Sequence, residues 1–198
     1  RHIPPAEKRI ALVLSSYPTK HARIGNAVGL DTPASAVVLL GQLQEAGYDL
    51  GGLDVSELEG DGLIHQLIAA GGHDVDWLTD EQLANAVAKV PLSTYARWFG
   101  GVPESLRTAM TEAWGEAPGE LYVDTSGAEP AIALAALRFG NVVLMIQPPR
   151  GFGENPVAIY HDPDMAPSHH YLAAYRWLEA PADEGGFGAQ AVVHLGKH

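Results

Sequence analysis

The sequence contains no cysteine among its 198 residues. This absence excludes disulfide bonds, zinc sites built on thiolates and covalent catalysis by a cysteine nucleophile. A metal site in this chain therefore has to use histidine, aspartate, glutamate, asparagine or glutamine side chains. The lack of cysteine is also compatible with a reducing compartment.

Long apolar runs and basic residues are both scarce. No apolar run approaches the roughly 20 residues of a membrane-spanning helix, and no charged-then-apolar leader opens the chain, so we expect a cytoplasmic protein. The 12 lysines and arginines face 24 aspartates and glutamates, which gives a formal net charge of −12. Such a surface repels phosphate backbones and anionic lipids, so we expect neither nucleic acid nor a membrane as a partner.

The common nucleotide and hydrolase motifs are missing too. Gly25 and Gly29 lie near an expected helix start, but their spacing fits neither GxGxxG nor GxxxxGK[ST]. The string TSGAE lacks the first glycine of a GxSxG nucleophile elbow. The sequence therefore favours neither ATP binding by this chain nor a serine hydrolase.

Apolar runs and helix caps predict an α/β fold. Residues 10–14, the apolar run after Gly140 and the stretch 189–195 are typical of strands in a parallel sheet. Asp31 or Thr32, followed by Pro33, predicts a helix start, and the stretch 168–179 has helical spacing of its aromatic residues. We expect one domain over 1–198, with a parallel-sheet, Rossmann-like core and a helix-rich insertion around 60–120.

Several of the few basic residues follow the predicted strands. In open parallel sheets, ligands bind beyond the carboxyl ends of the strands. The residues expected there, which carry positive charges or hydrogen-bond donors, are Lys20, Arg23 and Asn26 after the first strand, Gln147 and Arg150 after the second, and Lys197 and His198 after the third. Such a cluster in an acidic chain predicts a site for a ligand that bears carboxylates.

The stretch 160–178 concentrates five potential metal or proton ligands: His161, Asp162, Asp164, His169 and His170. Ser168 is a natural N-cap, which places the two adjacent histidines in the first turn of a helix, where the helix dipole favours neutral imidazole. Neighbouring side chains diverge by about 100°, so one ion is not expected to bind both. The aspartates are typical of turns, and His194 is expected in the core.

Three strings together resemble one family. They are RIALVLSSYPTKHARIGNAVGLDTPAS, GNVVLMIQPPRGFGENPVAIYHDPDMAPSHHYLAAYRWL and AVVHLGKH. They are similar to the large, tetrapyrrole-binding subunit of aerobic cobaltochelatase, which is related to the large subunit of magnesium chelatase. IQPPRGFG, IYHDPD and HLGKH resemble the cobalt branch.

The resemblance implies ATP-dependent insertion of Co²⁺ into hydrogenobyrinic acid a,c-diamide in cobalamin biosynthesis, which is a ligase-class reaction. It further implies that ATP is hydrolysed by separate AAA+ partner subunits and not by this chain. On this basis we expect the sequence to be a piece of a larger chelatase subunit that is inactive alone.

The expected roles follow from residue type and position. We expect metal delivery or proton acceptance by His161, by His169 or His170, and by His198, with His161, His170 and His198 as the metal ligands. Lys20, Arg23, Arg150 and Lys197 would hold the acid groups of the ring, and Asn26 and Gln147 its amides. Two alternatives remain: a magnesium chelatase large subunit, and a non-catalytic ligand-binding α/β module.

Overall fold

A computed structural model describes residues 3–15, 26–27, 29–71, 78–151 and 164–196. Its central sheet has four strands in the order β7 (Ala136–Phe139), β8 (Val142–Ile146), β1 (Ile10–Leu14) and β9 (Ala191–Leu195). β1 is parallel to both β8 and β9, whereas β7 forms an antiparallel hairpin with β8. The α/β fold class and three of the strands are therefore confirmed, and the antiparallel β7 makes the sheet a mixed one.

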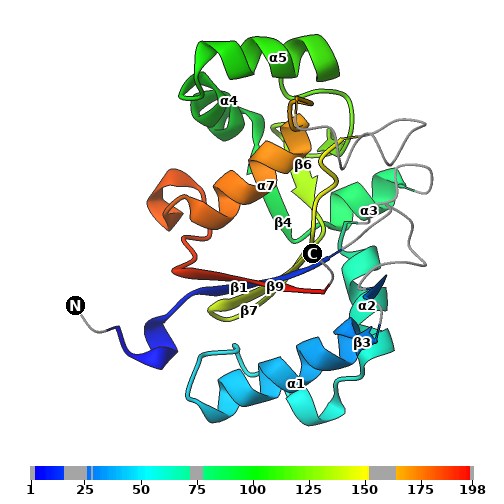
Figure 1. Ribbon diagram of the computed structural model, residues 1–198, viewed down its shortest axis with the longest axis vertical. Coiled ribbons are helices and arrows are strands. Elements are labelled where there is room, and N and C mark those ends of the chain that lie inside the picture. The colour runs from blue at the N-terminus through cyan, green and yellow to red at the C-terminus, as the bar shows by residue number, and fades with distance from the viewer. Residues whose placement is uncertain (1–2, 16–25, 28, 72–77, 152–163, 197–198) are drawn as a thin grey trace.

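Helices cover the two faces of this sheet (Figure 1). α1 (Thr32–Glu45) and α2 (Gly60–Ala69) lie on one face, where Leu12, Leu144 and Leu40 share a buried core. α7 (His169–Glu179) lies on the other face, where Val13 and Ala174 belong to a second core. The unbroken burial of β1 and β8 explains why both are apolar at every position.

Local capping fixes where the helices start. The Asp31 carboxylate accepts a hydrogen bond from the Ala34 N–H at 3.0 Å, which confirms the predicted cap of α1. Thr79 and Gln82 form a capping box at the start of α3 (Asp80–Asn85). α3 ends at Asn85, because the backbone of Ala86 leaves the helical conformation with φ −56° and ψ 124°, and β4 (Ala88–Pro91) follows.

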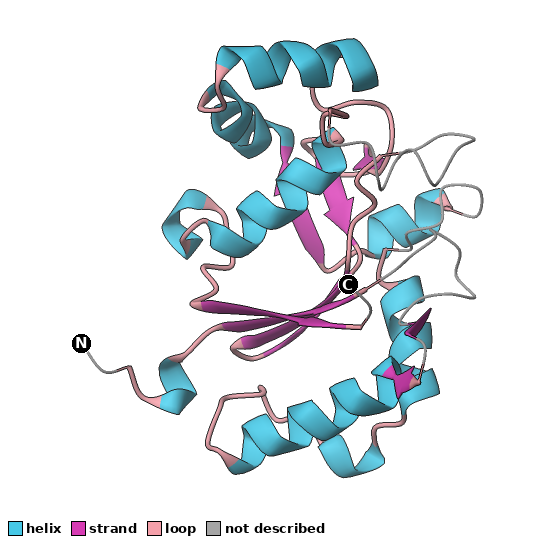
Figure 2. Ribbon diagram, viewed as in Figure 1, coloured by secondary structure: helices cyan, strands magenta, loops and turns pink. Residues whose placement is uncertain are grey.

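A second sheet was not predicted. It is antiparallel, has the order β4–β6–β5, and contains β6 (Ala131–Leu134) and β5 (Val123–Asp124). β4 and β6 run from the central sheet toward α4 (Leu92–Gly100) and α5 (Glu104–Trp114) (Figure 2). The region 60–120 thus contains a strand among its helices, and its status as an insertion stays a prediction.

The remaining elements of the described ranges are short. They are the 3-10 helices η1 (Pro5–Glu7), η3 (Val55–Glu57) and η5 (Ala182–Glu184) and the strand pair β2 (Asn26–Ala27) and β3 (Leu30–Asp31). Within the described ranges, no helix has the length and apolar character needed to cross a membrane.

Candidate functional site at the strand ends

The carboxyl ends of three strands lie next to one another in the central sheet. The register pairs Leu14 with Ile146 on one side and with Leu195 on the other. The chain therefore leaves β1, β8 and β9 from the same edge of the sheet, which is the edge at which open α/β sheets bind ligands.

Backbone contacts hold these ends together. The Ser15 N–H donates to the Leu195 carbonyl at 2.9 Å, and the Gln147 N–H donates to the Leu14 carbonyl at 2.8 Å. Gly196 has a φ of +133° and lies against the Ser15 side chain so closely that an added Cβ would overlap Ser15 Oγ. Only glycine fits both constraints, so the end of β9 is fixed directly beside the end of β1.

The end of β8 is tied to the start of α7. The Ser168 N–H donates to the Arg150 carbonyl at 2.8 Å, and Ser168 Oγ donates to the Pro149 carbonyl at 3.3 Å. The half-buried Arg150 donates from Nη2 to the Met165 carbonyl at 2.7 Å. A guanidinium has five N–H donors, so this bond positions Arg150 and still leaves it able to bind a carboxylate.

His169 is held from both sides at the start of α7. Its Nε2 lies 3.0 Å from the Gly115 carbonyl, which can only accept, so Nε2 carries the proton. Its Nδ1 lies 2.7 Å from the Tyr95 hydroxyl, which then donates to it. Burial lowers the pKa of His169 below its usual 6.5 and raises that of Tyr95. In this conformation both nitrogens of His169 are engaged, which does not support the expected metal or proton role.

His170 is equally buried but faces another neighbour. Its ring stacks on Tyr122 with centroids 3.9 Å apart, and its Nε2 donates to the Ala133 carbonyl at 3.0 Å. His170 is only 5% exposed. The Nε2 bond and the ring stacking link α7 to the region around the second sheet, and the expected metal role of His170 stays a prediction.

The structure describes only some of the other expected site residues. Lys20, Arg23, His161, Lys197 and His198 lie outside the described residues, as does Asp162, and for Asn26 only the backbone is described. Of the expected ligand-binding residues, the structure thus places the side chains of Gln147 and Arg150. His194 is half-buried on β9, not in the core as expected. Among the described residues, no group of three or more acidic or histidine side chains could hold a metal ion.

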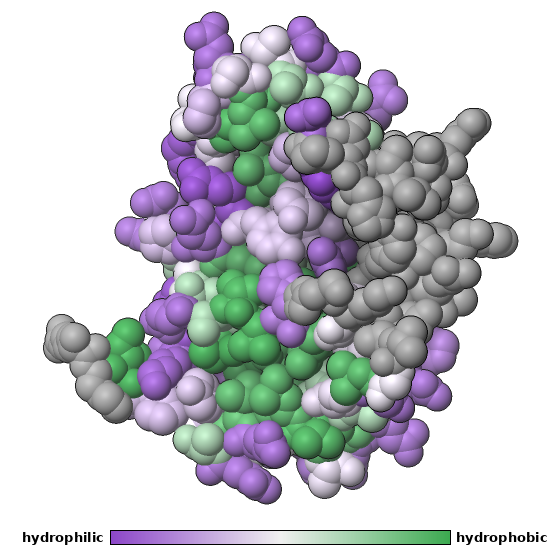
Figure 3. Space-filling view, in the orientation of Figure 1, coloured by the Kyte–Doolittle hydropathy of each residue, from purple (hydrophilic) through white to green (hydrophobic). Residues whose placement is uncertain are grey.

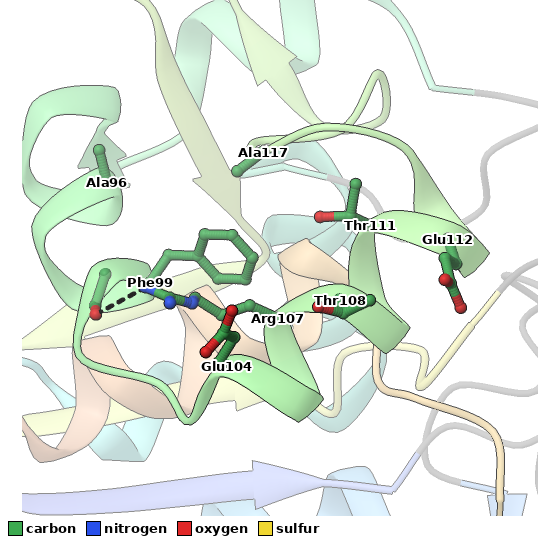
Figure 4. Close-up of a pocket in the computed structure, with 9 residues that line it drawn as sticks. Ala96, Phe99, Glu104, Arg107, Thr108, Thr111, Glu112 and Ala117 are labelled. Carbon is green, nitrogen blue, oxygen red and sulfur yellow. Dashed lines mark hydrogen bonds between the residues drawn. The ribbon is translucent and has the colours of Figure 1, made fainter.

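A described hollow lies away from these residues. It is a groove of about 500 Å³ between α4 and α5, with Phe99 in its middle and Arg107 and Glu104 on one side (Figure 4). Arg107 donates to the Gly100 carbonyl at 3.0 Å and so braces the groove internally. None of the expected site residues lines it.

Sequence reasoning missed the residues that surround this edge. Ser15 and Gly196 stand directly after two apolar runs, and a glycine immediately after a strand is a signal of close backbone approach. Tyr95 and Tyr122 carried no such signal, because their partners His169 and His170 are distant in sequence.

The model of the CobN/magnesium chelatase family matches residues 1–198, the whole chain. The chain belongs to this family.

The most informative relatives are cobaltochelatases. The chain is 42% identical, over 98% of its length, to the aerobic cobaltochelatase subunit CobN of Pseudomonas aeruginosa, of which it covers 14%. It is 54% identical to the solved catalytic subunit of cobaltochelatase from Mycobacterium tuberculosis, with a TM-score of 0.77, covering 99% of this chain and 15% of that one. A magnesium-chelatase subunit of Chlorobaculum parvum is 30% identical over 97% of this chain, which covers 14% of it. The chain thus spans about a seventh of these relatives.

Proposed function

We propose that this chain is part of the large subunit of an aerobic cobaltochelatase, and that it helps to bind the tetrapyrrole and Co²⁺ during cobalt insertion. The substrate ring is hydrogenobyrinic acid a,c-diamide, and ATP is hydrolysed by separate AAA+ partner subunits. The higher identity to cobaltochelatase subunits than to the magnesium-chelatase relative favours cobalt over magnesium. Cytoplasmic location stays a prediction.

The observation that carries the proposal is the shared edge of β1, β8 and β9 in a chain of this family. Arg150 at this edge supplies a fixed guanidinium, which suits the carboxylates of an acidic ring. Lys20, Arg23 and Lys197 belong to the segments that continue from the same strand ends, and we assign them the same role. Gln147 would form hydrogen bonds to the ring amides. Asn26, which lies further along the segment after β1, would do the same.

Metal insertion needs a ligand and a base. Co²⁺ has to lose water before it enters the ring, and the single ring N–H proton of the corrin has to leave as the Co–N bonds form. Neutral imidazole suits both tasks, and we assign them to His161 and His198. His169 and His170 instead act as scaffold, because their hydrogen bonds to Tyr95, Gly115 and Ala133 are internal to the fold.

An insertion assay tests this function. The natural polypeptide that carries this sequence is combined with its ATPase subunits, ATP, Co²⁺ and hydrogenobyrinic acid a,c-diamide, and the cobalt-containing ring is followed by absorbance. We expect cobalt insertion, and none by residues 1–198 alone. Selective binding of protoporphyrin IX with insertion of Mg²⁺ would instead assign the chain to the magnesium branch.

The metal assignment has its own test. His161→Ala and His198→Ala should each weaken Co²⁺ binding by the natural polypeptide about tenfold or more, as loss of a ligand does. His65→Ala is the matched control, because His65 is exposed on α2 and belongs to none of the segments that follow the three strands. If both variants bind Co²⁺ like the control, imidazole delivery from these segments is ruled out.

A further inference from the structure

β9 has the composition of a central strand but lies at the edge of the described sheet. Its only partner there is β1, although its sequence AVVHL is almost as apolar as that of β1. Natural edge strands are usually shielded by lysine, proline or a bulge. Residues 191–195 contain neither lysine nor proline, and their register with β1 runs without interruption.

Both faces of β9 are exposed. Val193 pairs with Leu12 on the α1 side, and Val192 pairs with Ala11 on the α7 side. Val192 is 43% exposed and Val193 38%, whereas Leu12 and Ala11 are fully buried. Apolar surface is gathered in the middle of the face on which β9 lies (Figure 3). Neither helix layer therefore reaches over β9 as it does over β1.

The outer edge of β9 has backbone groups directed away from the sheet. The Ser15 N–H donates to the Leu195 carbonyl, so the backbone groups of Leu195 and Val193 face β1. By alternation, the N–H and C=O of Val192 face the other way, where the described sheet has no further strand. Such an edge is a template for an added strand.

An aromatic row continues this surface on the α7 side. The rings of Tyr171 and Tyr175 lie 4.8 Å apart, and Tyr175 stacks on His194 of β9 at 6.3 Å. All three residues are half-buried. An element that lay beside β9 on this side would meet aromatic rings as well as Val192.

We propose that β9 is an internal strand in the natural polypeptide, where another apolar segment of the same polypeptide pairs with its outer edge and flanking structure covers both valines. The matched residues form only 14% to 15% of the relatives, so the rest of the polypeptide is an ample source of that segment. A second copy of this chain fits less well. Pairing two β9 edges would satisfy their backbones but would leave both valine faces uncovered. This proposal goes beyond the chelatase function and does not depend on it.

Hydrogen exchange in the natural polypeptide tests the proposal. The Val193 amide faces β1 and serves as the internal reference, whereas the Val192 amide faces the outer edge. If a strand is added, the Val192 amide should exchange as slowly as that of Val193, within about tenfold. Exchange of Val192 that is about 100-fold faster or more would overturn the proposal. Protection that falls when the protein is diluted 100-fold would assign the edge to a second copy and would overturn it as well.

A pair of variants provides a second readout. Val192→Lys places a charge in the proposed interface and should increase the rate of limited proteolysis of the natural polypeptide at least about tenfold. Val87→Lys is the control, because Val87 is 68% exposed and lies outside the central sheet. Equal proteolysis rates for the two variants would contradict the proposal.

Discussion

The first turn of α7 and the carboxyl edge of the central sheet are joined by a hydrogen bond from Ser168 to Arg150, yet they use their polar groups differently. In the turn, His169 and His170 are buried and bonded to Tyr95, Gly115 and Ala133. At the edge, backbone contacts fix the strand ends, and the side chains of Gln147 and Arg150 remain half-buried. This contrast supports our proposal that the histidine pair is scaffold and that the edge binds the ligand.

The largest effect expected from this comparison is on stability, from His170→Ala. The substitution removes a ring stacked on Tyr122 and leaves the buried Ala133 carbonyl without its donor. We expect the free energy of opening of α7 to fall by about 3 kcal/mol. Hydrogen exchange of the α7 amides in the natural polypeptide measures this change. A variant with unchanged protection and abolished Co²⁺ binding would reverse the scaffold assignment.

The second effect concerns the strand ends. Gly196→Ala would place a Cβ against Ser15 at a positive φ, so we expect a loss of about 2 kcal/mol of stability in β9 together with weaker ring binding. Gly62→Ala is the matched control. Gly62 lies in α2 with nothing within 4 Å of an added Cβ, so that variant should gain up to about 1 kcal/mol. Thermal unfolding and ring titration of both variants check the contrast. If Gly196→Ala has unchanged stability and unchanged ring affinity, the strand ends are not fixed by this close contact.

A smaller effect is expected from Tyr95→Phe. The variant keeps the ring packing but removes the hydroxyl that donates to His169 Nδ1. A buried acceptor without its donor costs about 1–2 kcal/mol. Exchange protection around α4 and the start of α7 should decrease accordingly, with cobalt insertion per folded molecule unchanged. A loss of insertion with full protection would instead give the Tyr95–His169 pair a chemical role.

The smallest expected effect is the pH dependence of stability that His169 causes. Burial holds the pKa of His169 below 6.5, so the unfolded state binds a proton more readily than the folded state does. Neutral His169 therefore makes its full contribution to the free energy of unfolding above pH 6.5. This contribution is lost as the pH falls toward the lower pKa of the folded state, and the free energy of unfolding then decreases by up to about 1.4 kcal/mol per pH unit. Unfolding measured from pH 7.5 to 5.5 should show this loss, and His169→Gln should flatten the slope.

The sequence predicted those parts of the molecule that depend on local pattern. The apolar runs of β1 and β8 and the caps Asp31 and Ser168 each act within a few residues. The second sheet escaped prediction, because β5 has two residues and β6 consists of the short run AIAL, which has no strand periodicity. The predicted parallel strands do share one edge of the sheet at their carboxyl ends, and a ligand site at that edge stays a prediction.

The environment of the histidines could not be predicted in the same way. The partners of His169 stand 74 and 54 residues away in the sequence, and only the packed fold brings them to its two ring nitrogens. The exposure of β9 is a similar case, because AVVHL shows that the strand is apolar but not which elements cover it. Long-range packing decides whether a polar side chain supports the fold or binds a ligand, and whether an apolar side chain is buried in the core or exposed to a partner segment.

The affinity of the natural polypeptide for hydrogenobyrinic acid a,c-diamide, followed by tryptophan quenching, tests the central claim most directly. Arg150→Ala and Lys197→Ala should each weaken binding about tenfold or more, since each removes a charge-assisted bond to a carboxylate. Arg138→Ala makes the same change of charge at an exposed residue of β7, which pairs with Val143 near the opposite end of β8, and should leave the affinity unchanged. If the affinities of the Arg150 and Lys197 variants match that of the Arg138 variant, the strand ends do not form the ring site.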